Sequence, residues 1–179
     1  EEFIDAVTRI KEWIAAGDIY QVNLSQSFVA EISGELFSLY QSLREASPAP
    51  MAAYLALDDR EILSSSPESF LKISGRRIET QPIKGTRPRF ADPAKDRQSA
   101  YQLQTSEKEI SELIMITDLL RNDLGQVCEF SSVVVKEMIR LETLAHVHHL
   151  VSTIVGTLRS EIDAIGAVAA CFPGGSITG

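Results

Sequence analysis

The stretch on which this chain's fold and chemistry both depend is residues 64–89, which read SSSPESFLKISGRRIETQPIKGTRPR. Two short apolar runs flank Ser74 and Gly75, a pattern that predicts a β-hairpin with its turn at those two residues. Such a hairpin folds Glu68 back beside Lys84. The stretch therefore predicts a carboxyl group and an amino group at one rim of an antiparallel sheet.

Lys84 has the surroundings expected of a reactive amine. Apolar Ile83 precedes it, and Gly85 follows, which can adopt a positive φ and let a ligand approach the backbone. Partial desolvation beside the cations Arg87 and Arg89 favours the neutral, nucleophilic form of a lysine. A lone lysine between prolines is more often a solvated loop residue, so motifs elsewhere in the chain have to decide between these two interpretations.

Composition indicates a globular protein and argues against some functions. The 179 residues are 44% hydrophobic and 23% charged, which suits one domain with a buried core. The net charge of −8 argues against nucleic-acid binding, because phosphate affinity comes mainly from clustered Lys and Arg. Cys128 and Cys171 lack metal or redox spacing and are expected to be buried apolar residues. Without a signal-like or membrane-length apolar run, the expected location is the cytoplasm and the expected partners include no membrane.

An anionic substrate of an acidic protein needs a local positive pocket. The sequence offers a cluster of cations for it, namely Arg76, Arg77, Lys84, Arg87 and Arg89.

Hydrophobic periodicity predicts an α+β fold in which antiparallel strands pack against helices. Helices are expected at residues 3–16, 36–43, 95–104, 106–122 and 162–169. Strands are expected at residues 22–32, 51–57, 61–65, 70–73, 77–83, 127–130, 133–138 and 146–158, with those from 51 to 83 forming a meander. Asn23 and Ser25 fall on the polar face of the first of these strands, where they either line a pocket or face solvent.

The helix predicted after Ser106 begins with a capping box that pairs Ser106 with Glu109. Glu107 and Glu109 are assigned to capping and to the helix dipole. Glu112 lies beside the apolar stripe, where a carboxylate is either a solvated boundary residue or a ligand. Gly125 is expected to end the helix as a left-handed cap.

Alternation along the last predicted strand separates its histidines. His149 shares a face with the apolar residues, whereas His146 and His148 fall on the opposite face, where solvent is expected. After the final helix, the glycine-rich residues 172–179 can offer backbone N–H groups and hydroxyls to an anion.

Several motifs in order along the chain resemble those of the chorismate-binding enzymes. Besides residues 64–89 they are YQVNLSQ at 20–26, EKEISEL at 107–113, DLLRNDLG at 118–125, HVHHLVS at 146–152 and FPGGSITG at 172–179. The resemblance implies two stacked sheets flanked by helices. It also implies that residues 1–179 are a partial catalytic domain, because the family continues with a substrate arginine and a second magnesium-binding glutamate.

The resemblance implies catalytic roles for three side chains. Lys84 is implied as the nucleophile, Glu68 as the proton donor and His149 as a residue near the substrate ring that acts in orientation and electrostatics. Anthranilate synthases of this family typically carry alanine at the position of Lys84. Lys84 therefore favours the branch that converts chorismate and ammonia into 4-amino-4-deoxychorismate for para-aminobenzoate and folate synthesis.

The resemblance also implies binding residues and partners. Gly85, Thr86, Gly175 and Ser176 are implied as substrate contacts, and Glu112 as a ligand of Mg²⁺. Ammonia is expected from a glutamine amidotransferase subunit. In the family, the strand at residues 22–32 resembles part of a regulatory tryptophan site.

Two alternative functions stay open at this point. In one, the chain is an anthranilate synthase or a related chorismate enzyme, and Lys84 takes no part in the reaction. In the other, the chain is an inactive fragment that serves only as a folding or docking module.

Overall fold

The computed structural model describes residues 2–176, and the chain divides into two compact units, residues 1–35 and residues 36–179. The first unit contains helix α1 (Glu2–Ala16), which ends as predicted where Gly17 adopts a φ of 82°. The predicted strand at residues 22–32 is wrong, because the structure has no regular element there and Val29 is 94% exposed. A strand needs a ladder partner to pair its backbone groups, and no described segment of this unit pairs with these residues.

The second unit begins with helix α2 (Leu36–Ala46) and a two-stranded antiparallel sheet. Its strands are β1 (Met51–Ala56) and β2 (Glu61–Ser66), as predicted. The ring of Phe37 on α2 packs edge-on against the ring of Tyr54 on β1, with centroids 5.2 Å apart. This aromatic contact holds the amphipathic helix against the hairpin.

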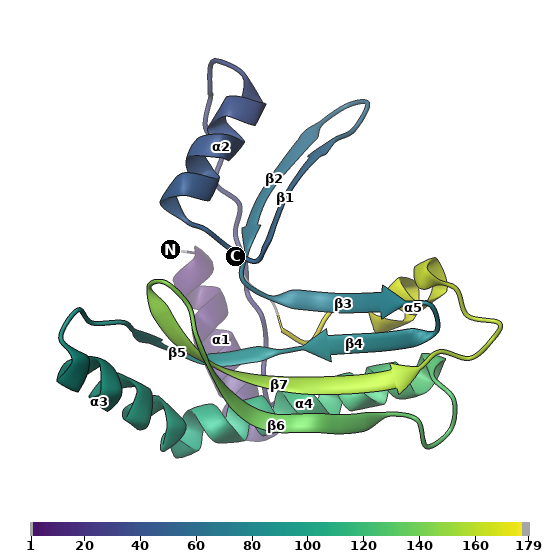
Figure 1. Ribbon diagram of the computed structural model, residues 1–179. Helices are drawn as coiled ribbons and strands as arrows, with labels where there is room; N and C mark the ends of the chain where they lie inside the picture. The colour runs from purple at the N-terminus through teal and green to yellow at the C-terminus, as the bar shows by residue number, and fades with distance from the viewer. Residues whose placement is uncertain (1, 177–179) are drawn as a thin grey trace. The chain divides into compact units, whose positions relative to one another are not determined.

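The main sheet has five strands in the order β3-β4-β7-β5, with β6 also paired to β7 (Figure 1). They are β3 (Ser69–Ser74), β4 (Arg77–Gln81), β5 (Ile83–Pro88), β6 (Val134–Thr143) and β7 (Val147–Thr157). All the pairings are antiparallel, so the predicted fold class is confirmed. The predicted meander is wrong in its pairing, since β1 and β2 form a separate sheet and β4 and β5 both pair with β7.

Pro82 divides the strand that was predicted at residues 77–83. Proline has no N–H to give to a ladder, so β4 ends before it and β5 begins after it. Its carbonyl still accepts a hydrogen bond of 3.1 Å from the N–H of Ser152. β4 and β5 therefore follow the same edge of β7, and Lys84 lies in a strand instead of a loop.

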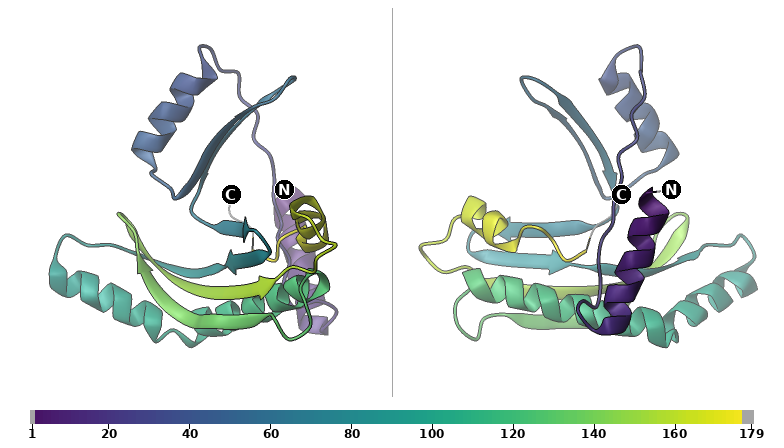
Figure 2. Two further views of the ribbon diagram at one scale, coloured as in Figure 1. Left: turned by 45° about the vertical axis from the view of Figure 1, so that its right-hand side comes forward. Right: turned by 180° about the vertical axis from the view of Figure 1, so that it is seen from behind.

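Three helices complete the unit: α3 (Pro93–Gln104), α4 (Glu107–Val127) and α5 (Ala164–Cys171). α4 runs along one face of the main sheet (Figure 2). The core between them is apolar and includes Ile78, Ile116, Leu120, Leu124 and Ile154. No helix among residues 2–176 has the length and apolar character that a membrane span requires.

α4 is longer than predicted. Gly125 lies within the helix and has no positive φ, and the strand predicted at residues 127–130 is replaced by the helix end and a turn. Leu124 and Val127 are 1% and 2% exposed, and burying such side chains stabilises by about 1.5–3 kcal/mol each. This outweighs the roughly 1 kcal/mol that a glycine costs within a helix, so the helix continues.

Candidate active site

Glu68 lies immediately before β3 and reaches the edge of β5. Its Oε1 accepts a hydrogen bond of 2.8 Å from the backbone N–H of Ile83. Because β3 pairs with β4 and not with β5, this N–H has no strand partner on that side. The carboxylate therefore takes the place of a ladder partner, directly beside the residue that precedes Lys84.

The side chain of Lys84 is 15% exposed, and its charged neighbour is Glu112 on α4. The Nζ atom lies 3.9 Å from Glu112 Oε1, which is within ion-pair range but too long for a hydrogen bond. The nearest charge is therefore a carboxylate, and not the arginines that the sequence suggested. The Glu112 carboxylate, 32% exposed, is also open to a ligand.

A β-bulge at Gly85 sets the side-chain arrangement after Lys84. Lys84 is opposite Leu150, and after the bulge Thr86 is opposite His149. Adjacent strand residues point to opposite faces, so Lys84 projects with Leu150 toward α4, while Thr86 and His149 project from the other face. A ligand that touches both sets has to lie at the open edge of β5.

His149 is 7% exposed and is held at one ring nitrogen. Its Nδ1 lies 3.0 Å from Thr86 Oγ1 and 3.3 Å from the carbonyl oxygen of Gly85. A carbonyl oxygen only accepts, so a protonated Nδ1 satisfies it and leaves the Nε2 lone pair of the neutral ring available. This arrangement suits orientation of a polar ligand group.

Gly85 has a φ of +74°, as predicted for this position, but its α-carbon faces protein instead of an open ligand space. A Cβ there would lie 2.8 Å from Leu103 Cδ1 and 3.1 Å from Glu109 Cβ. We expect Gly85→Ala to lower the free energy of unfolding by about 2–4 kcal/mol, the sum of left-handed backbone strain and overpacking, measured by urea denaturation. Gly75→Ala is the matched control. The φ of Gly75 is also positive, but a Cβ added there would have no atom of another residue within 4 Å. Equal losses in the two variants would show that the close packing at Gly85 contributes nothing.

Two carboxylates of α4 face β5. Glu109 and Glu112 share a helix face by their spacing, and Glu109 Oε2 would lie 3.1 Å from a Cβ at Gly85. The sequence favoured capping and the helix dipole for Glu109 over a role as a ligand. Its backbone N–H does donate to Ser106 Oγ at 3.4 Å, which leaves its carboxylate free to approach Gly85. The i, i+3 spacing between Glu109 and Glu112 was the sequence feature that indicated a shared helix face.

The carboxylates of Glu109 and Glu112 are the side chains that could bind the Mg²⁺ implied by the family resemblance. Mg²⁺ binds proteins through one or two carboxylates and completes its octahedron with water and substrate oxygens, so Glu109 and Glu112 fit it. Within residues 2–176, no group of three or more His, Cys, Asp or Glu side chains is arranged to hold a metal ion.

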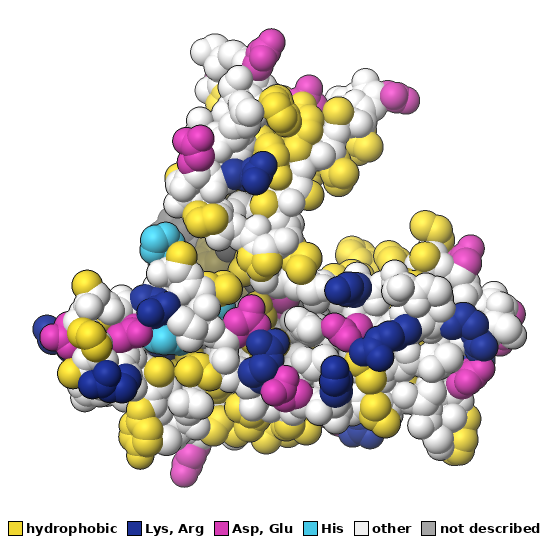
Figure 3. All heavy atoms as spheres, viewed as in Figure 1, with side chains coloured by type: hydrophobic (Ala, Val, Ile, Leu, Met, Phe, Trp, Pro, Cys, Tyr) yellow, Lys and Arg dark blue, Asp and Glu magenta, His cyan; other side chains and the backbone are white. Residues whose placement is uncertain are grey.

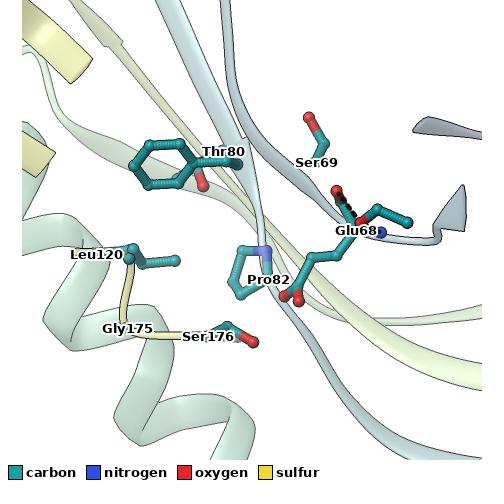
Figure 4. Close-up of a pocket in the computed structure, with 10 residues that line it drawn as sticks. Glu68, Ser69, Thr80, Pro82, Leu120, Gly175 and Ser176 are labelled. Carbon is teal, nitrogen blue, oxygen red and sulfur yellow. Dashed lines mark hydrogen bonds between the residues drawn. The ribbon is translucent and has the colours of Figure 1, made fainter. Parts of the chain in front are cut away.

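A pocket of about 120 Å³ joins Glu68 to the glycine-rich segment that follows α5. Gly175 and Ser176 line it opposite Glu68, whose side chain extends past the ring of Pro82 toward Ser176 (Figure 4). A Cβ on Gly175 would lie 2.4 Å from Leu119 Cδ2, so only glycine allows this segment to pack on α4. Residues 177–179 of the predicted anion loop lie outside the described part of the chain.

The structure thus places the predicted site residues in three groups around β5. Glu68, Gly175 and Ser176 share the small pocket, Lys84 contacts Glu112, and Thr86 contacts His149. Lys84, Glu112 and His149 do not line that pocket.

The predicted basic pocket is wrong. Arg77 pairs with Thr157 and Arg87 with His148, nine residues apart along β7 and therefore roughly 30 Å apart. Most of the predicted cations are also paired with carboxylates: Arg76 with Glu129, Arg77 with Glu79, Lys84 with Glu112 and Arg89 with Asp96. Basic and acidic side chains accordingly alternate over the sheet surface (Figure 3).

His148 was expected to face solvent, and this is wrong. It is 3% exposed, because β7 is a central strand whose residues 148–154 are all buried. Its ring is hydrogen-bonded on both sides, to Asp96 and to Thr143. His146 is exposed, as predicted.

Cys128 and Cys171 are buried free thiols, as predicted. Burial raises the pKa of both, that of Cys171 to about 11. Neither thiol therefore forms a thiolate near neutral pH, which fits a structural role.

Comparisons with known proteins show what the chain is similar to. The family model for chorismate binding enzyme matches residues 1–179. Aminodeoxychorismate synthase component 1 of Salmonella typhimurium is 46% identical over 178 residues, which covers 99% of this chain and 39% of that protein. Anthranilate synthase component 1 of Methanothermobacter marburgensis is 42% identical over 177 residues, covering 99% of this chain and 38% of that protein.

Among solved structures, anthranilate synthase component I from Streptococcus pneumoniae superposes with a TM-score of 0.82 at 33% identity, covering 94% of this chain and 37% of that one. The chain thus spans about two-fifths of the length of the curated relatives it matches.

Proposed function

This chain belongs to the chorismate-binding enzyme family, and from that premise we propose that it is part of the chorismate-aminating component of aminodeoxychorismate synthase. The proposed reaction converts chorismate and ammonia into 4-amino-4-deoxychorismate. The observation that carries this choice is Lys84, whose side chain is 15% exposed with Nζ 3.9 Å from Glu112 Oε1, and which directly follows Ile83, the residue whose N–H donates to Glu68. Overall identity cannot make the choice, because relatives named for either reaction match almost equally well.

The proposed chemistry proceeds through a covalent bond to Lys84. The amine attacks C2 of the ring, the double bonds shift, and the bond between C4 and its hydroxyl breaks. Glu68 gives its proton to the departing oxygen, which leaves as water. Ammonia then adds at C4, the double bonds shift back, and the bond between C2 and Lys84 breaks to release the product.

Other side chains of the site would hold the substrate. Glu109 and Glu112 would bind Mg²⁺, which supplies positive charge for a substrate carboxylate. Gly175 and Ser176 would contact an anionic group beside Glu68, because they line the same pocket. His149, oriented by Thr86, would contact the ring substituents from the other face of β5.

We assign the ammonia supply to a glutamine amidotransferase subunit. The relatives of this chain carry the name component 1, which implies a second component.

The proposed function is tested by product analysis on the full-length protein. With chorismate, Mg²⁺ and ammonium, we expect 4-amino-4-deoxychorismate, identified by its mass and by its conversion to para-aminobenzoate with an added lyase. Anthranilate as the main product would instead establish the anthranilate synthase alternative. Chorismate binding measured by calorimetry separates both from the docking-module alternative, which predicts none.

Glu112→Gln is expected to weaken Mg²⁺ binding by at least about tenfold with little effect on stability, because an amide is a much poorer ligand than a carboxylate for this hard cation. The measurement is the Mg²⁺ concentration that gives half-maximal rate, together with direct titration of the metal. Glu107→Gln is the control, since Glu107 is an exposed residue in the first turn of the same helix. An unchanged Mg²⁺ requirement in Glu112→Gln would remove Glu112 from the metal site.

A further inference from the structure

We propose that His148 is a positioning residue, which holds the backbone of β7 so that the neighbouring His149 points toward Thr86 and the substrate. This inference rests on the proposed function for its kinetic consequence. It concerns a buried group of residues on the face of β7 opposite to His149.

His148 joins three elements through its ring. Nε2 lies 3.0 Å from Asp96 Oδ1 on α3, and Nδ1 lies 3.0 Å from Thr143 Oγ1 at the end of β6. A carboxylate only accepts, so the Nε2 proton donates to Asp96. The histidine is 3% exposed, so its ring is enclosed, whereas Thr143 is exposed and the Asp96 side chain is 19% exposed.

Asp96 is itself held in place by other contacts. It accepts hydrogen bonds from Arg89 Nε at 2.9 Å and from the N–H of Phe90 at 3.0 Å. The Arg89 guanidinium keeps the pKa of this carboxyl far below its usual range, so Asp96 stays an anion near neutral pH. Arg89 also ties down the turn between β6 and β7, through Nη1 to the carbonyl of Leu144 at 3.0 Å and through its N–H to the carbonyl of His146 at 2.9 Å.

This network selects one of two registers for β5 on β7. Without the bulge at Gly85, Thr86 would lie opposite His148, and every later side chain of β5 would meet the wrong partner. The two adjacent histidines offer similar rings, so shape alone discriminates weakly between the registers. Asp96 and Thr143 lie on the face of β7 toward which His148 points, so they bond the ring of His148 and not that of His149. The ring of His149 is therefore the one that contacts Thr86.

A double-mutant cycle tests the inference. We expect His148→Leu to lower kcat by roughly 10²-fold, the cost of a misplacement of about 1 Å, while KM for chorismate changes only a few-fold. His148→Gln is the conservative variant, because its amide N–H reaches the position of Nε2 and still donates to Asp96. It should keep kcat within several-fold of the parent.

The decisive comparison uses a His149→Ala background. If His148 acts through His149, His148→Leu has little further effect on kcat there, so the two losses are strongly non-additive. Additive losses, or a His148→Gln enzyme as impaired as His148→Leu, would overturn the proposal. If His148→Leu does not fold, Thr143→Val, which removes only the Nδ1 partner, takes its place in the same cycle.

Failure of the proposed function can be told apart from failure of this inference. The kcat values of the double-mutant cycle can be measured for formation of anthranilate as well as of 4-amino-4-deoxychorismate, so the cycle can be evaluated with either product. For a protein without turnover, the Nδ1 chemical shift of ¹⁵N-labelled His149 reports its bond to Thr86. That shift should move in His148→Leu and stay in place in His148→Gln, and an unmoved shift in His148→Leu would overturn the positioning role.

Discussion

Lys84→Ala in the full-length protein is expected to abolish a covalent adduct that the unchanged protein forms with chorismate. When chorismate and Mg²⁺ are present without ammonia, the first half of the proposed reaction runs and the second cannot, so the adduct accumulates. Protease digestion and mass spectrometry should find it on the peptide that spans residues 81–87. Loss of a covalent nucleophile reduces kcat by up to about 10⁶-fold in well-studied enzymes, so formation of 4-amino-4-deoxychorismate should nearly cease.

The Lys84→Ala variant also has an informative product. Its motif becomes Pro-Ile-Ala-Gly-Thr, the form typical of the anthranilate branch, so ammonia or water should attack C2 directly and shift the product instead of only removing it. Lys72→Ala, at an exposed lysine of β3, is the control and should keep both adduct and rate. An undiminished rate of 4-amino-4-deoxychorismate formation in Lys84→Ala would end the covalent mechanism.

Glu68→Gln is expected to lower the rate of chorismate amination by about 10²–10⁴-fold, the usual contribution of a general acid. The substitution removes the transferable proton but keeps an oxygen that can accept the hydrogen bond from the N–H of Ile83. The edge of β5 should therefore stay intact, and the melting temperature should change by no more than a few degrees.

The rate of adduct formation locates the effect of Glu68 within the reaction. If Glu68 protonates the departing hydroxyl, the Lys84 adduct should form more slowly in Glu68→Gln, by the same factor as turnover. Glu161→Gln, at an exposed carboxylate after β7, is the matched control and should behave as the unchanged protein. Parental turnover in Glu68→Gln would mean that another group supplies the proton.

Local features of the candidate site were predictable because a few neighbouring residues decide them. The hairpin between β3 and β4 was predicted, but its turn lies one residue later than expected, because Ser74 pairs with Arg77 and the turn residues are Gly75 and Arg76. The positive φ of Gly75 suits such a two-residue turn. The start of α4 follows from the Ser106 hydroxyl, which caps a backbone N–H in its own first turn. Gly85 was likewise identified as a residue that can adopt a positive φ, and it does so.

The roles of charged and polar side chains were less predictable, because their partners lie far away in sequence. The arginines were predicted to form an anion site because they are close together in sequence. In the structure, Arg76 contacts Glu129 and Arg89 contacts Asp96, and such pairs cancel the charge that a substrate would need. For the same reason Glu109 was assigned to capping and to the helix dipole, since its closeness to Gly85 depends on how α4 lies against β5.

The sequence by itself determined the α+β class, the helices that carry an apolar stripe, and the identity of Glu68, Lys84, Glu112 and His149 as candidates. Tertiary structure alone decided which strands pair, where Pro82 interrupts the edge of β7, and that His148 is buried against Asp96. The physical reason is that helices and turns close hydrogen bonds within a few residues, so local sequence specifies them. A sheet instead pairs strands that are distant in sequence, and the register of β5 on β7 depends on contacts made only after the chain has folded.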